Sequence, residues 1–399
     1  MSKEEMIPKV RFENYSKNKA WEEFKLGELV TIKSGVSPAA FKYGEELYVK
    51  VDDLNYSFKY QNDTNMKVAE NLRYKKTKKG SVIFPKRGAA IMTNKVRIMG
   101  ISGYMDTNMM ALEPEGITTE FLYLYISKTG LYKIADTSTI PQINNKHIEP
   151  YKIIIPEENE QQKIGNLFEK LDQAISLQQQ VLEATKEYKQ SMQQKMFPKK
   201  DKKVPEIRFK EFRRKWEPIS LKDSIDIQGG FAFKSSQFGS GKMPIIRISN
   251  IMNNGKIVGP FKYYKEKDNF EKYKVSGGEY LIAMSGATTG KVGINKDIAY
   301  VNQRVGIIKT KLNVDNFFIG IILNMAKFQY YLTTQWGAGA QPNVSNKQIM
   351  NYNTLIPSFE EQQKIGSFFK TLDKKIEQEE KKLETYQSMK KALMQRMFV

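Results

Sequence analysis

The sequence predicts an α+β protein with two copies of a globular domain, each followed by a long helix, and three observations support this prediction. The stretch 155–197 recurs at 356–398 with the same offset of 201 residues at both ends. A weaker repeat, with offsets between 195 and 201 residues, covers segments that precede each stretch. Apolar residues in the repeated stretches alternate in steps of three and four, which is typical of a helix with one buried face.

The two repeated stretches are predicted to be long helices because neither copy contains an insertion, whereas loops tolerate changes of length. The 39 residues from 159 to 197 would form a rod of about 58 Å. We expect the two rods to close on each other as an antiparallel coiled coil; the alternative is two unrelated helices on separate domains. The apolar residues expected at the packing seam are Ile164, Phe168, Leu171, Ile175, Leu182, Ile365, Phe369, Leu372, Ile376 and Leu383.

The ends of both helices are marked in the sequence. Pro156 and Pro357 stand where each first turn should begin, and Pro198 should end the first helix. Ser358 and Glu361 have the spacing of a capping box, in which each side chain would satisfy a backbone amide.

The predicted domain boundaries follow from the repeat. They place a first domain at 1–154, a first helix at 155–198, a second domain at 199–355 and a second helix at 356–399.

Within the domains, short apolar runs between Gly, Asn and Asp turns predict strands, including 48–52 and its counterpart 245–249. Helical stretches are expected near 120–132 and 315–332.

The order of the pieces makes one further prediction. Residues 1–20 correspond to the segment 198–215 that follows the first helix, yet they begin the chain. If the chain closes into a ring with a pseudo-twofold axis, Phe12 should dock near Met397, at the end of the second helix.

Composition narrows the function. The chain has 399 residues, 64 Lys and Arg against 44 Asp and Glu, and a net charge of +20. This excess, together with 21 Tyr and 22 Phe, favours nucleic acid as the partner over an anionic membrane, because the charge is spread along the chain. The alternative is a basic surface that binds nothing.

Other chemistry is limited by what the sequence contains. There is no cysteine and only one histidine, His147, so disulfides, thiolate metal sites and sites built from several imidazoles are excluded. No run approaches 18 apolar residues and the first residues lack the apolar core of a signal peptide, so we expect a cytoplasmic protein.

The chain resembles the specificity subunit of type I restriction–modification systems over essentially its whole length. The motifs that carry the resemblance are the paired IP…EQQKIG…F…LD runs at 155–172 and 356–373, and the runs at 141–146 and 342–347 before them.

This resemblance implies two target-recognition domains that each read one half of a split double-stranded DNA site, with the helices as spacer and docking surface. It also implies two methyltransferase subunits that carry S-adenosylmethionine, with or without two restriction subunits. The chain itself would then need no cofactor and no metal.

Candidate DNA contacts come from turns and from the stretches in which the two halves differ. Lys and Arg can bind phosphate or guanine, and small residues let the backbone approach a phosphate. Solvated charged turns are the alternative. The candidates are Lys75, Lys76, Lys78, Lys79, Lys86 and Arg87 in the first half, and Lys262, Tyr263, Lys265, Ser285, Thr288 and Lys291 in the second.

Amides and cations at 144–146 and 343–347 occur in both halves. Residues that set different half-sites should differ between the halves, so we interpret these as structural. The segment 286–291 is one residue short of a phosphate-binding GxxxxGK loop, and Val292 stands where Ser or Thr would hold magnesium.

We find no catalytic candidates. The sequence has no Pro-Pro pair, which the Asn-Pro-Pro or Asp-Pro-Pro run of an adenine methyltransferase would require. The sequence thus predicts a non-enzymatic DNA-reading subunit; the rival hypothesis is a self-contained enzyme acting on DNA, such as a nuclease with dispersed carboxylates.

Overall fold

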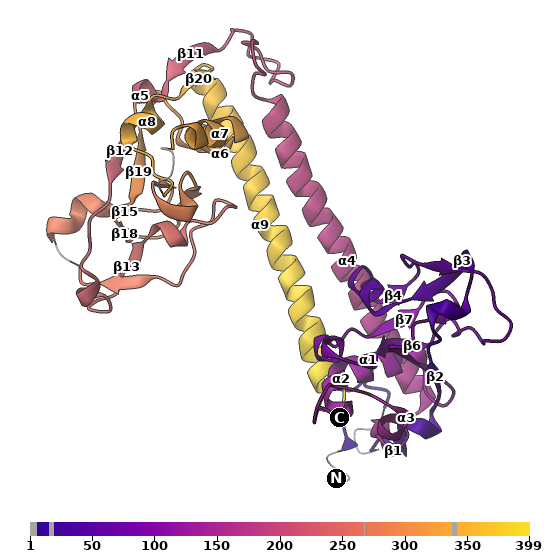
Figure 1. Cartoon of the computed structure of the whole chain (residues 1–399). Helices are drawn as coiled ribbons and strands as arrows, with labels where there is room; N and C mark the ends of the chain where they lie inside the picture. Colours follow the sequence, from indigo (N-terminus) through magenta and orange to yellow (C-terminus); the bar gives the residue numbers. More distant parts are fainter. Residues whose placement is uncertain (1–5, 16–19, 267, 337–340) are drawn as a thin grey trace. The chain divides into compact units, whose positions relative to one another are not determined.

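The computed structural model describes residues 6–15, 20–266, 268–336 and 341–399. The chain divides into two compact units, one formed by 1–180 with 381–399 and the other by 181–380 (Figure 1). Each unit contains one globular domain and a part of both long helices. The domain boundaries at 154, 198 and 355 stay a prediction.

The domain of the first unit is built on two main sheets and one strand pair. The five-stranded sheet has the order β2-β9-β6-β7-β4, the three-stranded sheet β5-β3-β8, and β1 pairs with β10. The strands are β1 Glu22–Lys25, β2 Val30–Ser34, β3 Tyr43–Val49, β4 Tyr60–Gln61, β5 Lys67–Val68, β6 Val82–Pro85, β7 Arg97–Met99, β8 Tyr104–Met105, β9 Met109–Pro114 and β10 Lys152–Ile155. The helices of this domain are α1 Thr119–Thr129, α2 Leu131–Ile134 and α3 Asn145–Ile148.

The domain of the second unit repeats this plan. Its two main sheets have the orders β12-β19-β16-β17 and β14-β13-β18-β15, and β11 pairs with β20. The strands are β11 Glu217–Ser220, β12 Ile225–Gly229, β13 Met243–Ile246, β14 Lys262–Tyr264, β15 Lys274–Val275, β16 Tyr280–Ala283, β17 Val292–Ile294, β18 Ala299–Val301, β19 Val305–Thr310 and β20 Asn353–Ile356. The helices are α5 Leu221–Ser224, α6 Asn316–Asn324, α7 Ala326–Thr334 and α8 Asn346–Met350.

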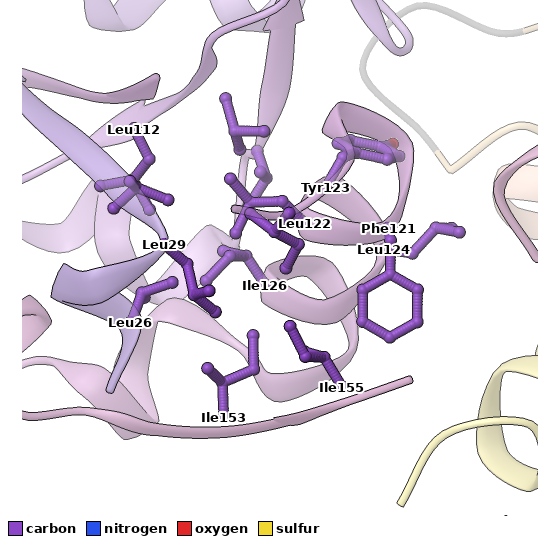
Figure 2. Close-up of a cluster of buried hydrophobic side chains, with 14 of the residues drawn as sticks. Leu26, Leu29, Leu112, Phe121, Leu122, Tyr123, Leu124, Ile126, Ile153 and Ile155 are labelled. Carbon is purple, nitrogen blue, oxygen red and sulfur yellow. The ribbon is translucent and has the colours of Figure 1, made fainter. Parts of the chain in front are cut away.

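The core of the first domain lies between its larger sheet and the strand pair β1-β10. Figure 2 shows Leu122 and Ile126 of α1 between Leu112 of β9 and the side chains of Ile153 and Ile155 of β10. All five are buried. Burial of such aliphatic side chains stabilises the domain by about 1.5 to 3 kcal/mol each.

The two long helices are α4, Glu158–Lys195, and α9, Phe359–Arg396, each of 38 residues. Burial of the seam residues continues along α4 as far as Leu182, apart from Leu171, whereas in α9 the seam is only half-buried beyond Leu372. Buried are Ile164, Phe168, Ile175, Leu182, Ile365, Phe369 and Leu372; half-buried are Leu171, Ile376 and Leu383.

Within each unit the segments of α4 and α9 run antiparallel. In the first unit Phe168 lies 6.1 Å from Phe398 between ring centroids, while Lys390 reaches Asp172 at 2.5 Å. The earlier residue of the C-terminal segment, Lys390, therefore contacts the later residue of α4, Asp172, as antiparallel segments require. The second unit repeats the arrangement with Phe369 against Phe197 and Lys189 paired to Asp373.

A buried ion pair anchors the start of each long helix. Arg11 donates from Nε and Nη2 to the two carboxylate oxygens of Glu160 at 2.7 and 2.6 Å. Arg208 forms the same two bonds to Glu361, both at 2.7 Å. The glutamates belong to the repeated EQQKIG runs, so part of that repeat encodes this bidentate contact.

The expected docking of the chain start is confirmed within the described residues. The Val10 amide donates to the Arg396 carbonyl at 2.9 Å, and Phe12 packs on the core cluster that contains Met397 and Phe398. Residues 1–5 and 16–19 of this prediction lie outside the described residues.

Three local predictions were wrong in detail. Glu361 does not form a capping box with Ser358, because its carboxylate binds Arg208 instead. Each expected helical stretch is two helices, the first pair interrupted at Gly130, whose φ of 85° is unsuited to a helix. The strands expected at 48–52 and 245–249 end at Val49 and Ile246 and continue as 3₁₀ turns.

Candidate nucleic-acid interface

Three strands of the first domain end side by side and present polar side chains. In the sheet order, β9 lies between β2 and β6, with Ser34 opposite Met110 and Pro85 opposite Met109. Lys86 follows β6, and its amide donates to the carbonyl of Asn108 at 2.8 Å. Its Nζ donates to Ser34 Oγ at 3.1 Å. We call Ser34, Lys86, Arg87, Asp106 and Asn108 the first sheet-end cluster.

Asp106 fixes the orientation of Asn108 in this cluster. Asp106 Oδ1 accepts hydrogen bonds from the amide N and the Nδ2 of Asn108, at 2.9 and 2.8 Å. Buried Tyr48 donates to the Val36 carbonyl at 2.6 Å and to Asp106 Oδ2 at 3.4 Å. Burial, followed by the charge of Asp106, raises the pKa of Tyr48, so its hydroxyl stays a donor at neutral pH.

The cations of the cluster differ in exposure. Lys86 is half-buried, whereas Arg87 is exposed. Burial lowers the pKa of Lys86, and the neighbouring charge of Arg87 lowers it further, while Asp106 acts in the opposite direction. A DNA phosphate bound beside Lys86 would stabilise the charged ammonium group, which burial and Arg87 destabilise.

Backbone hydrogen bonds join the turn at Lys86 to the repeated run 141–146, and the corresponding turn of the second domain to the run 342–347. The Gly88 amide donates to the Pro141 carbonyl at 2.8 Å, and Ile143 donates to the Lys86 carbonyl at 2.9 Å. In the second domain, the Gly286 amide donates to the Pro342 carbonyl at 2.8 Å, and the Val344 amide donates to the Met284 carbonyl at 2.9 Å.

The amides of these runs begin short helices. Asn144 precedes α3, and its backbone amide donates to His147 Nδ1 at 3.1 Å. In the same place in the second domain, the Ser345 amide donates to Gln348 Oε1 at 2.8 Å. These contacts agree with a structural role for the shared residues, and they place half-buried His147 in a helix cap.

The second domain has the same strand ends with different side chains. The Met284 amide donates to the Arg304 carbonyl at 2.9 Å, as Lys86 does to Asn108. We call Gly229, Met284, Ser285, Asn302 and Arg304 the second sheet-end cluster. Its members occupy the places of Ser34, Lys86, Arg87, Asp106 and Asn108, respectively.

Further backbone hydrogen bonds confirm this correspondence. Asp106 and Asn302 each donate at 2.9 Å to the last residue of the neighbouring parallel strand, Val49 and Ile246. Each accepts a 2.9 Å bond from the residue three positions later. The two clusters therefore share one backbone frame, on which a Lys, an Arg and an Asn in the first domain are replaced by Met, Ser and Arg in the second.

The candidates predicted from the sequence fall in several places. Lys86, Arg87 and Ser285 belong to the sheet-end clusters. Thr288 ends the 3₁₀ turn Gly286–Thr288, and Lys291 immediately precedes β17; both are half-buried. Lys262 and Tyr263 are exposed on β14, which is the outer strand of its sheet, and Lys265 follows them.

The lysines at 75–79 in the first domain differ in whether they have an acidic partner. Lys76 pairs with Glu70 at 2.7 Å and with Glu46 at 3.0 Å. Lys78 lies 3.5 Å from Glu113. The side chains of Lys75 and Lys79 are exposed. All of these DNA contacts stay predictions.

Sequence reasoning missed Asp106, Asn108, Asn302 and Arg304. A signal was present, because 105–109 and 301–305 both place apolar residues around three polar ones at an offset of 196. The hydrogen bonds between strand ends, rather than the spacing, reveal that these residues lie beside Lys86 and Met284.

Neither long helix, nor any other described helix, is apolar over enough length to cross a membrane. Among the same residues no group of three or more His, Cys, Asp or Glu side chains is arranged to hold a metal ion.

Comparison with known proteins places the chain in a family. The family model described as the type I restriction modification DNA specificity domain matches 18–187 and again 213–385. The specificity subunit of the type I restriction enzyme MjaVIII of Methanocaldococcus jannaschii is 28% identical over 314 residues, which cover 74% of this chain and 73% of that protein. A specificity subunit of the putative type I restriction enzyme MjaX of the same organism is 24% identical, over 72% of this chain and 69% of its own length.

Solved structures show the same fold. The S subunit of the type I restriction–modification system of M. genitalium has a TM-score of 0.65 at 16% identity and covers 99% of both chains. A chain from a structure concerned with complex assembly and conformational transition of the type I R-M system has a TM-score of 0.55 at 15% identity, over 94% of this chain and 96% of that one. Because the family model matches both halves, with their two sheet-end clusters, the chain belongs to the family of type I restriction modification DNA specificity domains.

Proposed function

We propose that the chain reads a DNA site in two parts, with one sheet-end cluster for each part. The observation that carries this proposal is the shared backbone frame with different side chains. A frame repeated through the same hydrogen bonds presents side chains in the same geometry, so replacing the side chains changes which bases fit. Two domains with different clusters would therefore read two different half-sites.

The chemistry of the two clusters suits the edges of bases. An arginine can donate two hydrogen bonds to guanine, an asparagine can bind adenine through both of its amide atoms, and a lysine binds phosphate or guanine. Arg87 and Asn108 offer these groups in the first domain, and Arg304 with Ser285 in the second. The exposed lysines Lys75 and Lys79 would add phosphate contacts that position the duplex without reading it.

The long helices would set the distance between the half-sites and dock the partner subunits. Helices of fixed length keep two reading domains at a fixed separation, and a separation near one turn of DNA, about 34–36 Å, would leave both on one face of the duplex. We infer that two methyltransferase subunits carry S-adenosylmethionine and the chemistry, with or without two restriction subunits, in the cytoplasm where the DNA lies. The chain itself would be the non-catalytic reader.

The test is to co-express the full chain with a type I methyltransferase subunit from the same host and to map adenine methylation by single-molecule sequencing. We expect a split motif with two fixed halves and a fixed gap. Exchanging 20–154 for the corresponding segment of a relative should change one half only. A matched control exchanges 220–355 and should change only the other half.

A continuous motif, or a change in both halves after a single exchange, would refute reading by separate domains. The purified chain without partners, incubated with DNA, magnesium and S-adenosylmethionine, should neither methylate nor cleave. Activity of the chain alone would instead support a self-contained enzyme.

A further inference from the structure

A buried lysine in the first unit links the larger sheet of the domain to a long helix. Lys59 directly precedes β4, the outer strand of the five-stranded sheet, and its side chain is only 5% exposed. Its Nζ lies 2.6 Å from Glu120 Oε2 on α1 and 3.7 Å from Asp172 Oδ2 on α4. One ammonium group therefore bridges the sheet, the domain helix and the long helix.

The same carboxylates bind other elements of the unit. Asp172 Oδ1 accepts from Lys390 of α9 at 2.5 Å. Tyr60, the residue after Lys59, donates from its hydroxyl to Glu120 at 2.6 Å and to Glu169 of α4 at 3.3 Å. The pKa of Tyr60 is raised, mainly by burial and then by Glu120, so the hydroxyl remains a donor. We call Lys59, Tyr60, Glu120, Asp172 and Lys390 the anchor network.

Among the described residues of the second unit, the part of this network that recurs is the pair that joins the two helices. Lys189 pairs with Asp373, which repeats the pair of Lys390 and Asp172. Phe317 occupies the place of Glu120, because both lie against the glycine of the repeated KIG run, Gly366 and Gly165.

Two ion pairs that join the second domain to α9 beyond its buried first turns are solvated. Lys256 reaches Glu380, with side chains that are 43% and 25% exposed, and Lys296 reaches Glu377 at 2.6 Å, with both side chains more than half exposed. These pairs line a groove of about 420 Å³ that also contains Tyr280 and Ile376. The charged contacts that the second domain makes further along α9 are thus solvated, whereas those that the first domain makes with α4 centre on a buried lysine.

We propose that Lys59 is a positioning residue that fixes the orientation of the first domain on the helix pair, and that it thereby sharpens the choice of spacer length. This inference rests on the proposed reading of a two-part site. A buried charge is strongly held only in the geometry that pairs it, whereas exposed pairs contribute little and exchange with water. Changing the spacer by one base pair displaces a half-site by about 3.4 Å and rotates it by about 35°. A rigidly held domain would lose its contacts with the displaced half-site, whereas a loosely held domain could reorient and keep them.

The experiment uses the complete methyltransferase complex and a library of sites with both half-sites constant and the spacer varied by one base pair in either direction. The wild-type chain must first yield a split motif; without one, the proposed function fails before Lys59 is tested. For Lys59→Met we expect about a tenfold loss of discrimination between the native and the altered spacers, with both half-site sequences unchanged. Lys256→Met, which removes an exposed pair in the second domain, is the matched control and should keep the wild-type profile.

Two results would overturn the inference. One is a spacer profile as sharp in Lys59→Met as in the wild type. The other is an equal loss of methylation at all spacers, which indicates general destabilisation rather than loosened positioning. If Lys59→Met does not fold, Glu120→Gln, which keeps a partner for Tyr60 and removes the charge facing Lys59, should broaden the profile in the same way. Lys59→Arg, which keeps the cation, should restore most of the discrimination.

Discussion

The amide of Lys86 donates a 2.8 Å hydrogen bond to the carbonyl of Asn108, and this one contact brings together two residues that lie 22 positions apart, with β7 and β8 between them. The same bond joins Met284 to Arg304 in the second domain. The backbone of this strand end is therefore constant while its side chains vary. That combination is what a protein needs to read two different sequences with one scaffold.

Replacing Arg304 by Ala should weaken recognition of one half-site only. A lost base contact of this type costs about 1 to 3 kcal/mol, which corresponds to roughly 5- to 150-fold in affinity. Asn108→Ala is the counterpart and should affect only the other half-site. Titration of the complex with duplexes altered in either half measures both effects. An equal loss on all duplexes, including unrelated DNA, would mean that Arg304 contacts phosphate rather than bases.

Lys86 should make DNA binding depend on pH in the alkaline range. Burial, followed by Arg87, lowers its pKa below the ordinary 10.5 in the free protein. A bound phosphate favours the charged form and raises the pKa, so binding takes up a proton. Affinity should therefore fall as the pH rises from neutral toward 10.5. Salt-matched titrations should show a shallower fall for Lys86→Arg, whose guanidinium stays charged, and for Lys86→Met. An unchanged slope in both variants would exclude this role.

Arg11→Ala should strongly destabilise the first unit. It leaves the carboxylate of Glu160, which is fully buried, without the partner that forms two hydrogen bonds to it. Breaking a buried pair from one side costs about 3 to 5 kcal/mol in the free energy of unfolding. Arg208→Ala should act similarly in the second unit. Lys199→Ala removes an exposed pair with Glu206 and should change the free energy of unfolding by about 0.5 kcal/mol or less. Denaturant titrations, monitored by circular dichroism, measure the free energy of unfolding of the three variants.

Gly165→Ala should destabilise the protein although alanine is the better helix former. In a solvated helix this change gains about 1 kcal/mol. Here a Cβ on Gly165 would lie 2.7 Å from Cβ of Glu120, and one on Gly366 would lie 2.5 Å from a carboxylate oxygen of Asp315. Neither distance can be tolerated without a shift: Cβ of Glu120 is fixed to the backbone of α1, and Asp315 would have to give up the hydrogen bond that its carboxylate accepts from the Phe318 amide. Thermal unfolding should show lower midpoints for both alanine variants, and a raised midpoint would mean that the helices shift without cost.

The duplicated plan, the long helices and their buried stripe could be predicted from the sequence alone. Helices that pack along their length conserve spacing, so the repeat with its constant offset of 201 residues was readable without a structure. The docking of Phe12 near Met397 followed from the order of the repeated pieces. These features depend on periodicity, segment length and the order of the repeated segments, all of which can be read from the sequence without knowledge of tertiary contacts.

The polar sites were decided by tertiary structure. The sequence shows equal charges at Lys76 and Lys86, but Glu46 and Glu70 pair with the first, whereas the second lies at the strand ends beside Asn108. Lys59 carries no distinguishing signal in the sequence, and only folding places it between Glu120 and Asp172. The physical reason is that the role of a charged group depends on the partners and the burial it acquires, and residues far apart in the sequence supply both.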